Sequence, residues 1–346
     1  MHLIVGMDGK PLAPPRAGVY RYTAGLVSGW QRLGPVDAEL VVLQPKRPRR
    51  TAPWVLLDLQ WATCRRFHVF HFPFYYPPLF PCCPVTVAIH DVLVLTNPEW
   101  FSGGRFNTLR WLIPKGARRA SAVVTGTRWV AGQLEEICRV PAERIRIIPY
   151  GLDHQRFAPP DPQWVAEVKT RLGLHRPFLL MVGALEPRRG VDTLLQAAWL
   201  LRERGEELEL VLVGQERGAV PALADPPAWV RRLGFVEDAL LPALYAGAAV
   251  VVAPSRGEGF DLPVLEALAC GGVVVASDIP VHREVFASAV QFFATGQAEA
   301  LAAAVQQVLE DTTLARTLRQ AGPKLAQNFR WERAAAQHLA LFREVA

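Results

Sequence analysis

The chain has 346 residues, of which 51% are hydrophobic and 20% are charged, and this composition excludes an intrinsically disordered protein. The length suits two domains better than one, and no apolar run reaches the roughly 20 residues that a membrane-spanning helix needs. The formal net charge of +6 fits an anionic partner but does not require one. Because no recognition helix or aromatic platform accompanies this charge, we expect no nucleic acid; phosphorylated substrates and an anionic membrane surface fit the charge at least as well.

Two features bear on the cellular compartment. The chain opens on a strand-like run, Leu3–Met7, without the basic start and the cleavage site of a signal peptide, so we expect a cytoplasmic protein. The five cysteines are odd in number and show no metal-ligand spacing. We therefore expect reduced thiols and no metal site built on them.

The first half of the chain alternates apolar runs with stretches of helical spacing, which predicts a parallel sheet covered by helices. The predicted strands are 3–7, 39–43, 54–57, 69–72, 85–91, 122–125 and the run that begins at Ile145. Helices are predicted from Gly18 and over 106–119. An aromatic, proline-rich segment at 67–84 either packs inside the domain or contacts lipid or sugar, and its prolines exclude a central strand after Pro73.

Two residues of this half lie where a ligand could bind. Gly18 opens a helix after the first strand, and a glycine there lets the backbone approach a ligand, although a plain turn is the more common explanation. His90 ends the strand 85–91 together with Asp91, at the edge where open α/β sheets bind ligands. A histidine in that place is more often a structural hydrogen-bonding residue than a catalytic one.

The second half repeats the same pattern of strand and helix. The predicted strands are 178–183, 208–214, 248–253, 273–276 and 290–293, and the predicted helices include two within 298–327 and one at 331–345. A proline-rich linker at 159–162 separates the halves. We therefore expect one domain at 1–165, a second at 166–330, and a final helix at 331–346.

Two arginines, Arg188 and Arg189, follow the strand 178–183 and directly precede a helix. Guanidinium groups bind phosphate bidentately, so adjacent arginines at the end of a strand suit a diphosphate. A solvated basic turn is the ordinary alternative.

The stretch 254–285 carries the strongest pattern in the chain. A glycine-bracketed turn connects a buried strand to a helix that Asp261 can cap and that stops at Gly271. Such a turn offers backbone N–H groups and a positive helix end to an anion. Glu258 lies in the turn and Glu266 in the helix, where carboxylates can accept hydrogen bonds from sugar or ribose hydroxyls. Taken singly, each glutamate is more often a solvated surface residue.

Residues 258–271 read Glu-Gly-Phe-Asp-Leu-Pro-Val-Leu-Glu-Ala-Leu-Ala-Cys-Gly. This string closely resembles the donor-binding signature of the family 4 retaining glycosyltransferases, Glu-Gly-Phe-Gly-Leu-Pro-x-x-Glu-Ala-Met-Ala-Cys-Gly, and weaker similarities extend from Gly18 to the C-terminus. The resemblance implies the GT-B fold, an α/β architecture of two Rossmann-like, doubly wound parallel-sheet domains that face each other across a cleft. The N-terminal domain would bind the acceptor, the C-terminal domain the nucleotide sugar, and the final helix would pack back on the N-terminal domain.

The resemblance also implies roles for individual residues. Its catalytic residues would be His90 near the transferred sugar, Glu258 on the sugar hydroxyls, and Arg189 on the phosphates in place of the lysine of many relatives. Glu266 would hold the ribose. The donor-binding residues that it implies are Gly18, Arg188, Arg189, Phe235, Val236, Glu258, Gly259, Phe260, Asp261, Leu262 and Glu266, with Phe235 and Val236 at the nucleotide base.

In the implied reaction, a hexose of the mannose or glucose type moves from a nucleoside diphosphate to an acceptor hydroxyl with retention, in glycan, polysaccharide or glycolipid synthesis. The two arginines and the helix N-terminus would stabilise the leaving diphosphate, so we expect no metal ion and no further cofactor. GDP-mannose is the first donor that we expect, and a UDP-sugar the second. The acceptor stays open between a glycan, a lipid-linked sugar and a small molecule, and the basic clusters suit peripheral contact with an anionic inner membrane face.

Three departures from the family pattern bear on these expectations. Asp261 stands where relatives have glycine, and we expect it to contact a sugar hydroxyl or to cap the helix, with altered donor choice. Ala184 replaces a frequent arginine, and residues 127–130 replace a Ser-Glu-Phe-Ser sequence. Ala184 and residues 127–130 leave open a catalytically silent nucleotide-sugar-binding protein. A GT-B nucleotide-sugar epimerase, which acts on the donor alone, is a separate alternative.

Overall fold

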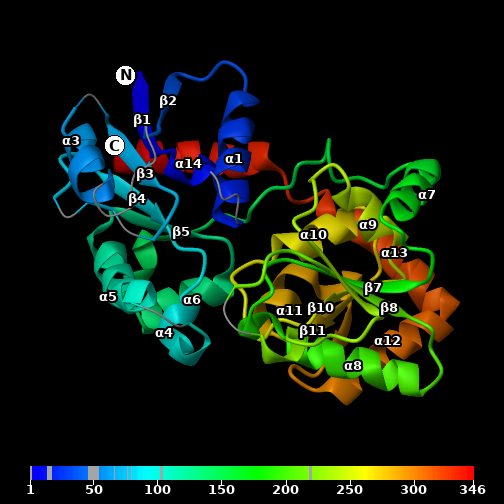
Figure 1. Cartoon of the computed structure of the whole chain (residues 1–346). Helices are drawn as coiled ribbons and strands as arrows, with labels where there is room; N and C mark the ends of the chain where they lie inside the picture. The colour runs from blue at the N-terminus through cyan, green and yellow to red at the C-terminus, as the bar shows by residue number, and fades with distance from the viewer. Residues whose placement is uncertain are drawn as a thin grey trace. The chain divides into compact units, whose positions relative to one another are not determined.

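The computed structural model describes residues 2–13, 18–45, 54–65, 67–75, 77–78, 80–101, 104–217 and 220–346. The chain divides into two compact units. Unit 1 comprises Met1–Gly151 and Phe329–Ala346, and unit 2 comprises Leu152–Asn328. Figure 1 labels the α-helices and most of the strands of both units. The basic run 46–50, one of the clusters behind the expected contact with an anionic membrane, lies outside the described residues.

Unit 1 is built on a six-stranded, fully parallel sheet in the order β2-β1-β3-β4-β5-β6. The strands are β1 (Leu3–Asp8), β2 (Ala38–Leu43), β3 (Val69–Phe72), β4 (Val85–Ala88), β5 (Ala122–Thr125) and β6 (Ile145–Ile147). The α-helices are α1 (Gly18–Gln31), α3 (Gln60–Thr63), α4 (Leu93–Thr96), α5 (Gly104–Arg119), α6 (Arg128–Glu136) and α14 (Trp331–Val345). Strands β3, β4 and β5 are buried along their whole length, as expected for parallel strands with both faces covered.

One predicted strand of unit 1 is wrong. Residues Trp54–Leu59 form a π-helix that leads directly into α3. An apolar run of four residues does not distinguish a strand from a buried helical turn. Here Trp54 and Leu59 pack into the core formed with α5 and α6, and Trp54 Nε1 donates a hydrogen bond to Asp8 Oδ1 at 2.8 Å. The segment thus covers the sheet instead of extending it.

Helix α14 packs against α1 through a notch that receives Trp331, and we call Gly25, Gly29 and Gly151 the Trp331 notch. A Cβ atom at Gly25 would lie 2.0 Å from the Trp331 ring, and one at Gly29 would lie 2.3 Å from the Trp331 carbonyl oxygen. A Cβ atom at Gly151 would lie 2.2 Å from the backbone nitrogen of Trp331. Only residues without a side chain allow this approach of the two backbones.

A chain of hydrogen bonds also ties α14 to the sheet through a buried tyrosine. His338 Nδ1 lies 2.8 Å from the Ala334 carbonyl, which can only accept, so the Nε2 atom of His338 accepts from the Tyr22 hydroxyl at 2.9 Å. The Tyr22 oxygen then accepts from His71 Nε2 at 3.3 Å, and His71 Nδ1 accepts from Thr86 Oγ1 at 2.9 Å. Burial lowers the pKa of His338 to about 4 and that of His71 well below its ordinary value, so both rings are neutral.

The expectation of reduced thiols is wrong for one cysteine pair of unit 1. Cys64 and Cys82 form a disulfide, with their Cα atoms 4.7 Å apart, while Cys83, Cys138 and Cys270 are free. The segment around Cys82 is held against α3, because the Phe80 backbone N–H donates to Gln60 Oε1 at 3.0 Å. A separation of 18 residues fits no sequence motif, and this long-range contact is what brings the two cysteines together.

Unit 2 contains a second six-stranded parallel sheet, in the order β12-β11-β10-β7-β8-β9. The strands are β7 (Phe178–Val182), β8 (Glu209–Val213), β9 (Val230–Gly234), β10 (Val250–Ala253), β11 (Val274–Ser277) and β12 (Gln291–Phe293). The helices are α7 (Pro162–Arg171), α8 (Val191–Glu203), α9 (Leu241–Gly247), α10 (Leu262–Ala269), α11 (Pro280–Phe286), α12 (Ala298–Glu310) and α13 (Thr312–Ala326). The sequence missed β9, an edge strand whose middle carries Arg231 and Arg232.

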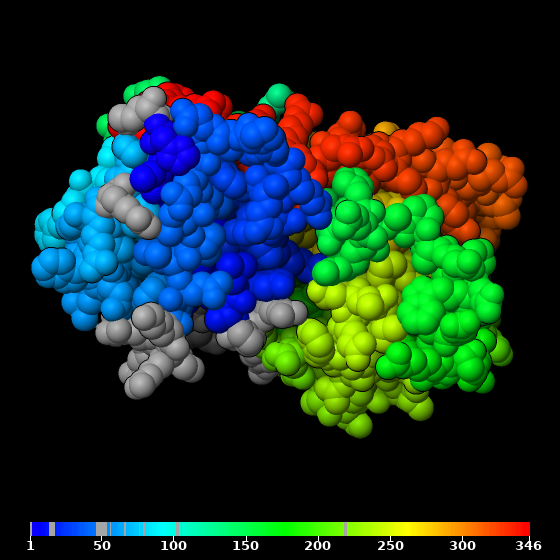
Figure 2. All heavy atoms as spheres, turned by 90° about the horizontal axis from the view of Figure 1, so that it is seen from above, coloured from blue at the N-terminus to red at the C-terminus, as the bar shows by residue number. Residues whose placement is uncertain are grey.

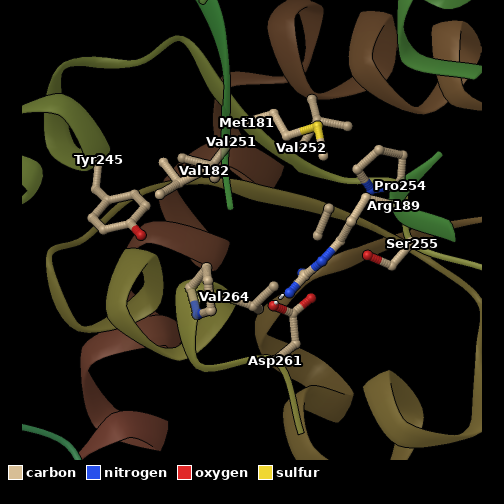
Figure 3. Close-up of a pocket in the computed structure, with 12 residues that line it drawn as sticks. Met181, Val182, Arg189, Tyr245, Val251, Val252, Pro254, Ser255, Asp261 and Val264 are labelled. Carbon is tan, nitrogen blue, oxygen red and sulfur yellow. Dashed lines mark hydrogen bonds and ion pairs between the residues drawn. The ribbon is translucent and has the colours of Figure 1, made fainter. Parts of the chain in front are cut away.

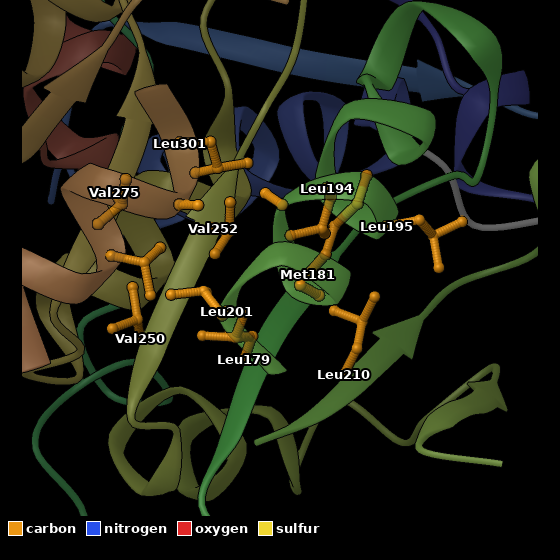
Figure 4. Packing of buried hydrophobic residues seen from close by; sticks show 14 of the residues in the cluster. Leu179, Met181, Leu194, Leu195, Leu201, Leu210, Val250, Val252, Val275 and Leu301 are labelled. Atoms are coloured by element: carbon orange, nitrogen blue, oxygen red, sulfur yellow. The ribbon is translucent and has the colours of Figure 1, made fainter. Parts of the chain in front are cut away.

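The largest core of unit 2 lies between the sheet and helices α8 and α12. Figure 4 shows Leu194 and Leu201 of α8 together with strand residues such as Met181, and Leu301 of α12 packs into the same cluster. Helix α10 contacts both α9 and α13, and α7 contacts α9. Figure 2 shows the green atoms of α7 beside yellow-green atoms on the surface of this unit. The core places β7 and β10 side by side at the centre of the sheet.

The boundary between the units precedes the predicted residue 165. The segment from Leu152 belongs to unit 2 because its side chains bind there. Arg156 Nη1 lies 3.0 Å from Asp238 Oδ2, and the Phe157 ring lies 6.5 Å from the Tyr245 ring between centroids.

Candidate functional site

The candidate site of unit 2 lies at the topological switch point of its sheet, where the order in which strands are added reverses. From β7 the chain winds outward to β8 and β9, whereas β10, on the other side of β7, begins the run to β11 and β12. Loops that leave the carboxyl ends of such neighbouring strands diverge and form the usual binding site of an open α/β sheet. Here these are the loop 183–190 after β7 and the loop 254–261 after β10. They approach so closely that a Cβ atom at Gly190 would lie 2.1 Å from the Pro254 carbonyl oxygen.

The two loops bring together the arginines and one of the glutamates that the sequence singles out. Arg189 Nη1 lies 2.8 Å from Glu258 Oε1, and Arg188 Nη1 lies 3.2 Å from Glu258 Oε2. Arg188 Nε also pairs with Glu186 Oε1 at 2.7 Å. The arginines are about 15% exposed and the Glu258 side chain 6%, so these pairs are shielded from water and interact more strongly than surface pairs. The alternatives of a solvated turn and a solvated Glu258 are therefore wrong.

Asp261 does not cap α10 with its side chain, so that half of the expectation for this residue is wrong. Its backbone has φ = 72° and ψ = 67°, a left-handed conformation in which aspartate is tolerated and glycine is favoured. This geometry is a conformational reason for a glycine at the same place in the resembled signature. The carboxylate instead reaches Arg189 Nη1 at 3.3 Å and His282 Nε2 at 3.1 Å.

A small pocket opens beside this cluster, with a cavity volume of about 20 Å³. Figure 3 shows the Arg189 guanidinium and the Asp261 carboxylate meeting within it, with Ser255 and Tyr245 among the other lining residues. Strand residues of β7 and β10 form its apolar part. Arg189 Nε is buried and has no hydrogen-bond partner among the described residues, which leaves one guanidinium donor unfilled beside the pocket.

The remaining candidates of unit 2 lie on the same carboxyl side of the sheet or in α10. Glu266 is 2% exposed and accepts a hydrogen bond from the Tyr245 hydroxyl at 3.0 Å, so it is no solvated surface residue. Phe235 and Val236 follow β9 and are 68% and 8% exposed. Gly259, Phe260 and Leu262 form the turn and the first residue of α10. The roles of these residues toward a donor stay predictions.

Two candidates, His90 and Gly18, lie in unit 1. His90 Nε2 donates to the Pro73 carbonyl at 2.8 Å, so its Nδ1 accepts from the Tyr150 hydroxyl at 2.6 Å. Burial lowers the pKa of His90 despite the opposing effects of Pro73 and Asp91. A ring with both nitrogens engaged is held rigidly, and it must release a partner before it can bind a sugar hydroxyl. Gly18 is the first residue of α1, and a Cβ atom there would have no atom of the described residues within 4 Å.

Sequence reasoning missed Glu186, Tyr245 and His282. Glu186 stands beside the arginines, and its proximity to two cations was the signal that could have marked it. Tyr245 and His282 each bind a carboxylate 21 residues away in the chain. No local pattern connects residues at that distance, so only the fold identifies them.

Two family models match the chain, one in each half. Residues 9–156 match the model described as Glycosyltransferase Family 4, and residues 163–325 match the model described as Glycosyl transferases group 1. The chain belongs to the group 1 glycosyltransferases of family 4. Its two six-stranded parallel sheets with flanking helices form the GT-B fold, as the signature predicted.

Named relatives and solved structures agree with this assignment. This glycosyltransferase is 29% identical over 298 residues to O-antigen chain mannosyltransferase B of Escherichia coli, covering 84% of the chain and 76% of the relative. It is 32% identical over 291 residues to D-inositol 3-phosphate glycosyltransferase of Salinispora arenicola, covering 75% of the chain but only 63% of that relative. Anabaena HepE in complex with UDP and glucose superposes with a TM-score of 0.77 at 17% identity, covering 99% and 100% of the two chains.

The described residues contain neither a cluster suited to a metal ion nor a helix suited to span a membrane. No group of three or more His, Cys, Asp and Glu side chains there is arranged to hold a metal ion. Within the same ranges, no helix is both long enough and apolar enough to cross a bilayer.

Proposed function

We propose that this glycosyltransferase moves a hexose from a nucleoside-diphosphate sugar to an acceptor hydroxyl with retention of configuration. The observation that carries the proposal is the buried cluster of Arg188, Arg189 and Glu258 at the switch point of the unit 2 sheet. Guanidinium groups in that place suit a diphosphate. GDP-mannose is the first donor and a UDP-sugar the second, since one relative is named as a mannosyltransferase and HepE was solved with UDP-glucose.

The proposed chemistry begins with an exchange of partners in this cluster. Without a donor, the arginines are paired with Glu186 and Glu258. A diphosphate carries more charge than either carboxylate and would take the guanidinium groups, with the unfilled Arg189 Nε as a further donor. Glu258 would then be free to accept hydrogen bonds from the sugar hydroxyls. As the glycosidic bond stretches, both arginines and the N-terminus of α10 would stabilise the developing charge, so the proposal includes no metal ion or further cofactor.

A donor panel tests this function. Purified protein is incubated with GDP-mannose, UDP-glucose and an ADP-sugar in the presence of EDTA, with and without a panel of glycan, lipid-linked and small-molecule acceptors. We expect one nucleoside diphosphate to be released faster than the others, acceptor to increase the rate, and NMR to show the donor's anomeric configuration in the product. Conversion of the donor to another sugar without acceptor would instead indicate an epimerase. Binding without turnover for every donor and acceptor would indicate a silent binding protein.

We further propose that unit 1 contacts an anionic membrane through the exposed side of α5. Arg110, Trp111, Arg118 and Arg119 are exposed there, and the Trp111 side chain is 58% exposed. Lys115 Nζ lies 3.4 Å from the Trp111 ring centroid. Cations beside an exposed tryptophan suit the interface of an anionic bilayer, where each basic residue contributes about 1 kcal/mol.

Vesicle flotation measures this contact. We expect the protein to float with anionic vesicles at low salt, to remain in solution with zwitterionic vesicles, and to dissociate as salt is raised. The double variant Arg110→Glu, Arg119→Glu should lose the binding, whereas Arg171→Glu, an exposed arginine of α7, should lose little. Equal binding to both vesicle types would contradict the proposal.

A further inference from the structure

A buried histidine outside the donor signature holds the one aspartate inside it. His282, on α11, is fully buried, and its Nε2 atom lies 3.1 Å from Asp261 Oδ2, whose side chain is 2% exposed. The other ring nitrogen, Nδ1, lies 2.9 Å from the Ser277 carbonyl oxygen. The ring thus bridges the first turn of α10 and the end of β11.

Both nitrogens of His282 face atoms that can only accept. A carbonyl oxygen has no proton to give, so Nδ1 must carry one, and an ionised carboxylate likewise requires a proton on Nε2. The Ser277 hydroxyl, 3.3 Å from Nδ1, does not change this count, because it donates to the Ser255 carbonyl. A ring with two N–H groups is an imidazolium, and His282 therefore carries a positive charge next to Asp261.

Asp261 is ionised for a related reason. Burial by itself would raise the pKa of this carboxyl, but the charge of Arg189 and the hydrogen bond and charge of His282 together hold the pKa below its usual range. An ionised carboxylate at 2% exposure is stable only with such partners. Its two oxygens are divided between them, Oδ1 to Arg189 and Oδ2 to His282.

The charges of the whole cluster then balance. The positive groups are Arg188, Arg189 and His282, and the negative groups are Glu186, Glu258 and Asp261. Without the charge of His282, the only cation in contact with Asp261 among the described residues would be Arg189. The carboxylate would then compete directly with an incoming phosphate for that guanidinium group.

We propose that His282 is a positioning residue of the donor site: its imidazolium neutralises Asp261 and thereby leaves Arg189 available to the diphosphate of the donor. This inference rests on the proposed function for the identity of the ligand, but not for the charge on His282. It extends the donor site to α11, which lies beyond the signature 258–271. Asp261 becomes a carboxylate that the site tolerates because it has a dedicated counterion.

The affinity test uses His282→Gln, whose amide can still donate a hydrogen bond to Asp261 but carries no charge. GDP and UDP are titrated calorimetrically against the full chain. We expect the preferred nucleotide to bind at least about tenfold more weakly to His282→Gln. The buried Asp261 carboxylate then lacks the positive charge of His282 and competes with the diphosphate for Arg189. Adding Asp261→Asn, which keeps the left-handed backbone accessible, should restore most of the affinity. His175→Gln, an exposed histidine of the same unit, should bind as the wild type does.

Wild-type affinity in His282→Gln would show that the charge is dispensable and would overturn the proposal. The proposal would also be overturned if the double variant His282→Gln, Asp261→Asn bound nucleotide more weakly than His282→Gln alone. If His282 only filled space, each substitution would weaken binding separately and the two losses of affinity would add. Thermal unfolding of each variant identifies any that fails to fold. If His282→Gln fails to fold, the nucleotide affinity of the double variant is compared with that of Asp261→Asn alone. A tenfold difference in affinity between those two variants would likewise overturn the proposal.

A measurement without any nucleotide separates this inference from the proposed function. The chain has eight histidines, and ¹⁵N NMR of their rings distinguishes imidazolium from neutral imidazole. We expect an imidazolium signal that His282→Gln removes and that Asp261→Asn converts to a neutral ring. A neutral His282 ring in the wild type would overturn the inference. If the wild type binds neither GDP nor UDP, the proposed function fails, while the NMR signal still decides the charge of His282.

Discussion

Glu258→Gln is expected to lower kcat with the preferred donor by about 10²–10³-fold, the size of effect seen when one preorganised group is removed from a transition-state site. The side chain keeps its volume and loses its charge. In the free protein, the neutral amide would attract Arg188 and Arg189 less strongly than the Glu258 carboxylate does. In the proposed donor complex it would replace charge-assisted hydrogen bonds to the sugar hydroxyls by neutral ones of about half the strength. Initial-rate kinetics with saturating acceptor measure the effect.

The matched control is Glu186→Gln, which changes the same residue type on the same arginine. Glu186 pairs with Arg188 Nε but has no assigned role on the sugar, so we expect kcat to fall by less than about tenfold. A Glu258→Gln enzyme that keeps wild-type kcat and KM would remove Glu258 from the proposed mechanism. Equal losses in both variants would assign Glu258 to the positioning of the arginines alone.

Gly29→Ala is expected to undock α14 from α1 and to destabilise unit 1 by about 3 kcal/mol, the upper part of the range for overpacking. The new Cβ atom would lie 2.3 Å from the Trp331 carbonyl oxygen, and a backbone atom cannot rotate away as a side chain can. Hydrogen exchange read by mass spectrometry should show faster exchange over 331–345, with unit 2 unchanged.

Gly132→Ala is the control for this change. Gly132 is an exposed glycine within α6, and a Cβ atom there has no atom of the described residues within 4 Å. Alanine is the better helix former by about 1 kcal/mol, so this variant should be at least as stable as the wild type. Unchanged exchange over 331–345 in Gly29→Ala would show that α14 is not held by the Trp331 notch.

The sequence predicted most of what depends on local pattern. The strands β10 and β11 with α10 between them follow from an apolar run, a glycine turn and a glycine stop, and the family signature on the same residues predicted the GT-B fold. The same apolar criterion failed at 54–57, where four apolar residues begin a π-helix. It also failed at β9, where the position at the edge of the sheet allows arginines inside a strand.

What the sequence could not predict depends on contacts between distant residues. Asp261 was expected to cap α10 or to meet a sugar, because nothing near it in the chain announces His282. Glu258 and the two arginines were each identified from separate loops, but their pairing follows only from β7 and β10 lying side by side. The disulfide of Cys64 with Cys82 likewise required a loop to pack on α3.

The covalent order of unit 1 has a consequence for synthesis. Unit 2 is inserted between Gly151 and Phe329, so the whole of it emerges from the ribosome before the residues that complete unit 1 exist. Until then the Trp331 notch of Gly25, Gly29 and Gly151 is empty, and the Tyr22 hydroxyl has no His338 ring to accept its hydrogen bond. Unit 2 can therefore reach its native state during translation, whereas unit 1 must wait in an incomplete form with apolar surface on α1 uncovered. Chaperones should therefore bind unit 1 of the nascent chain, and not unit 2, until α14 has been synthesised.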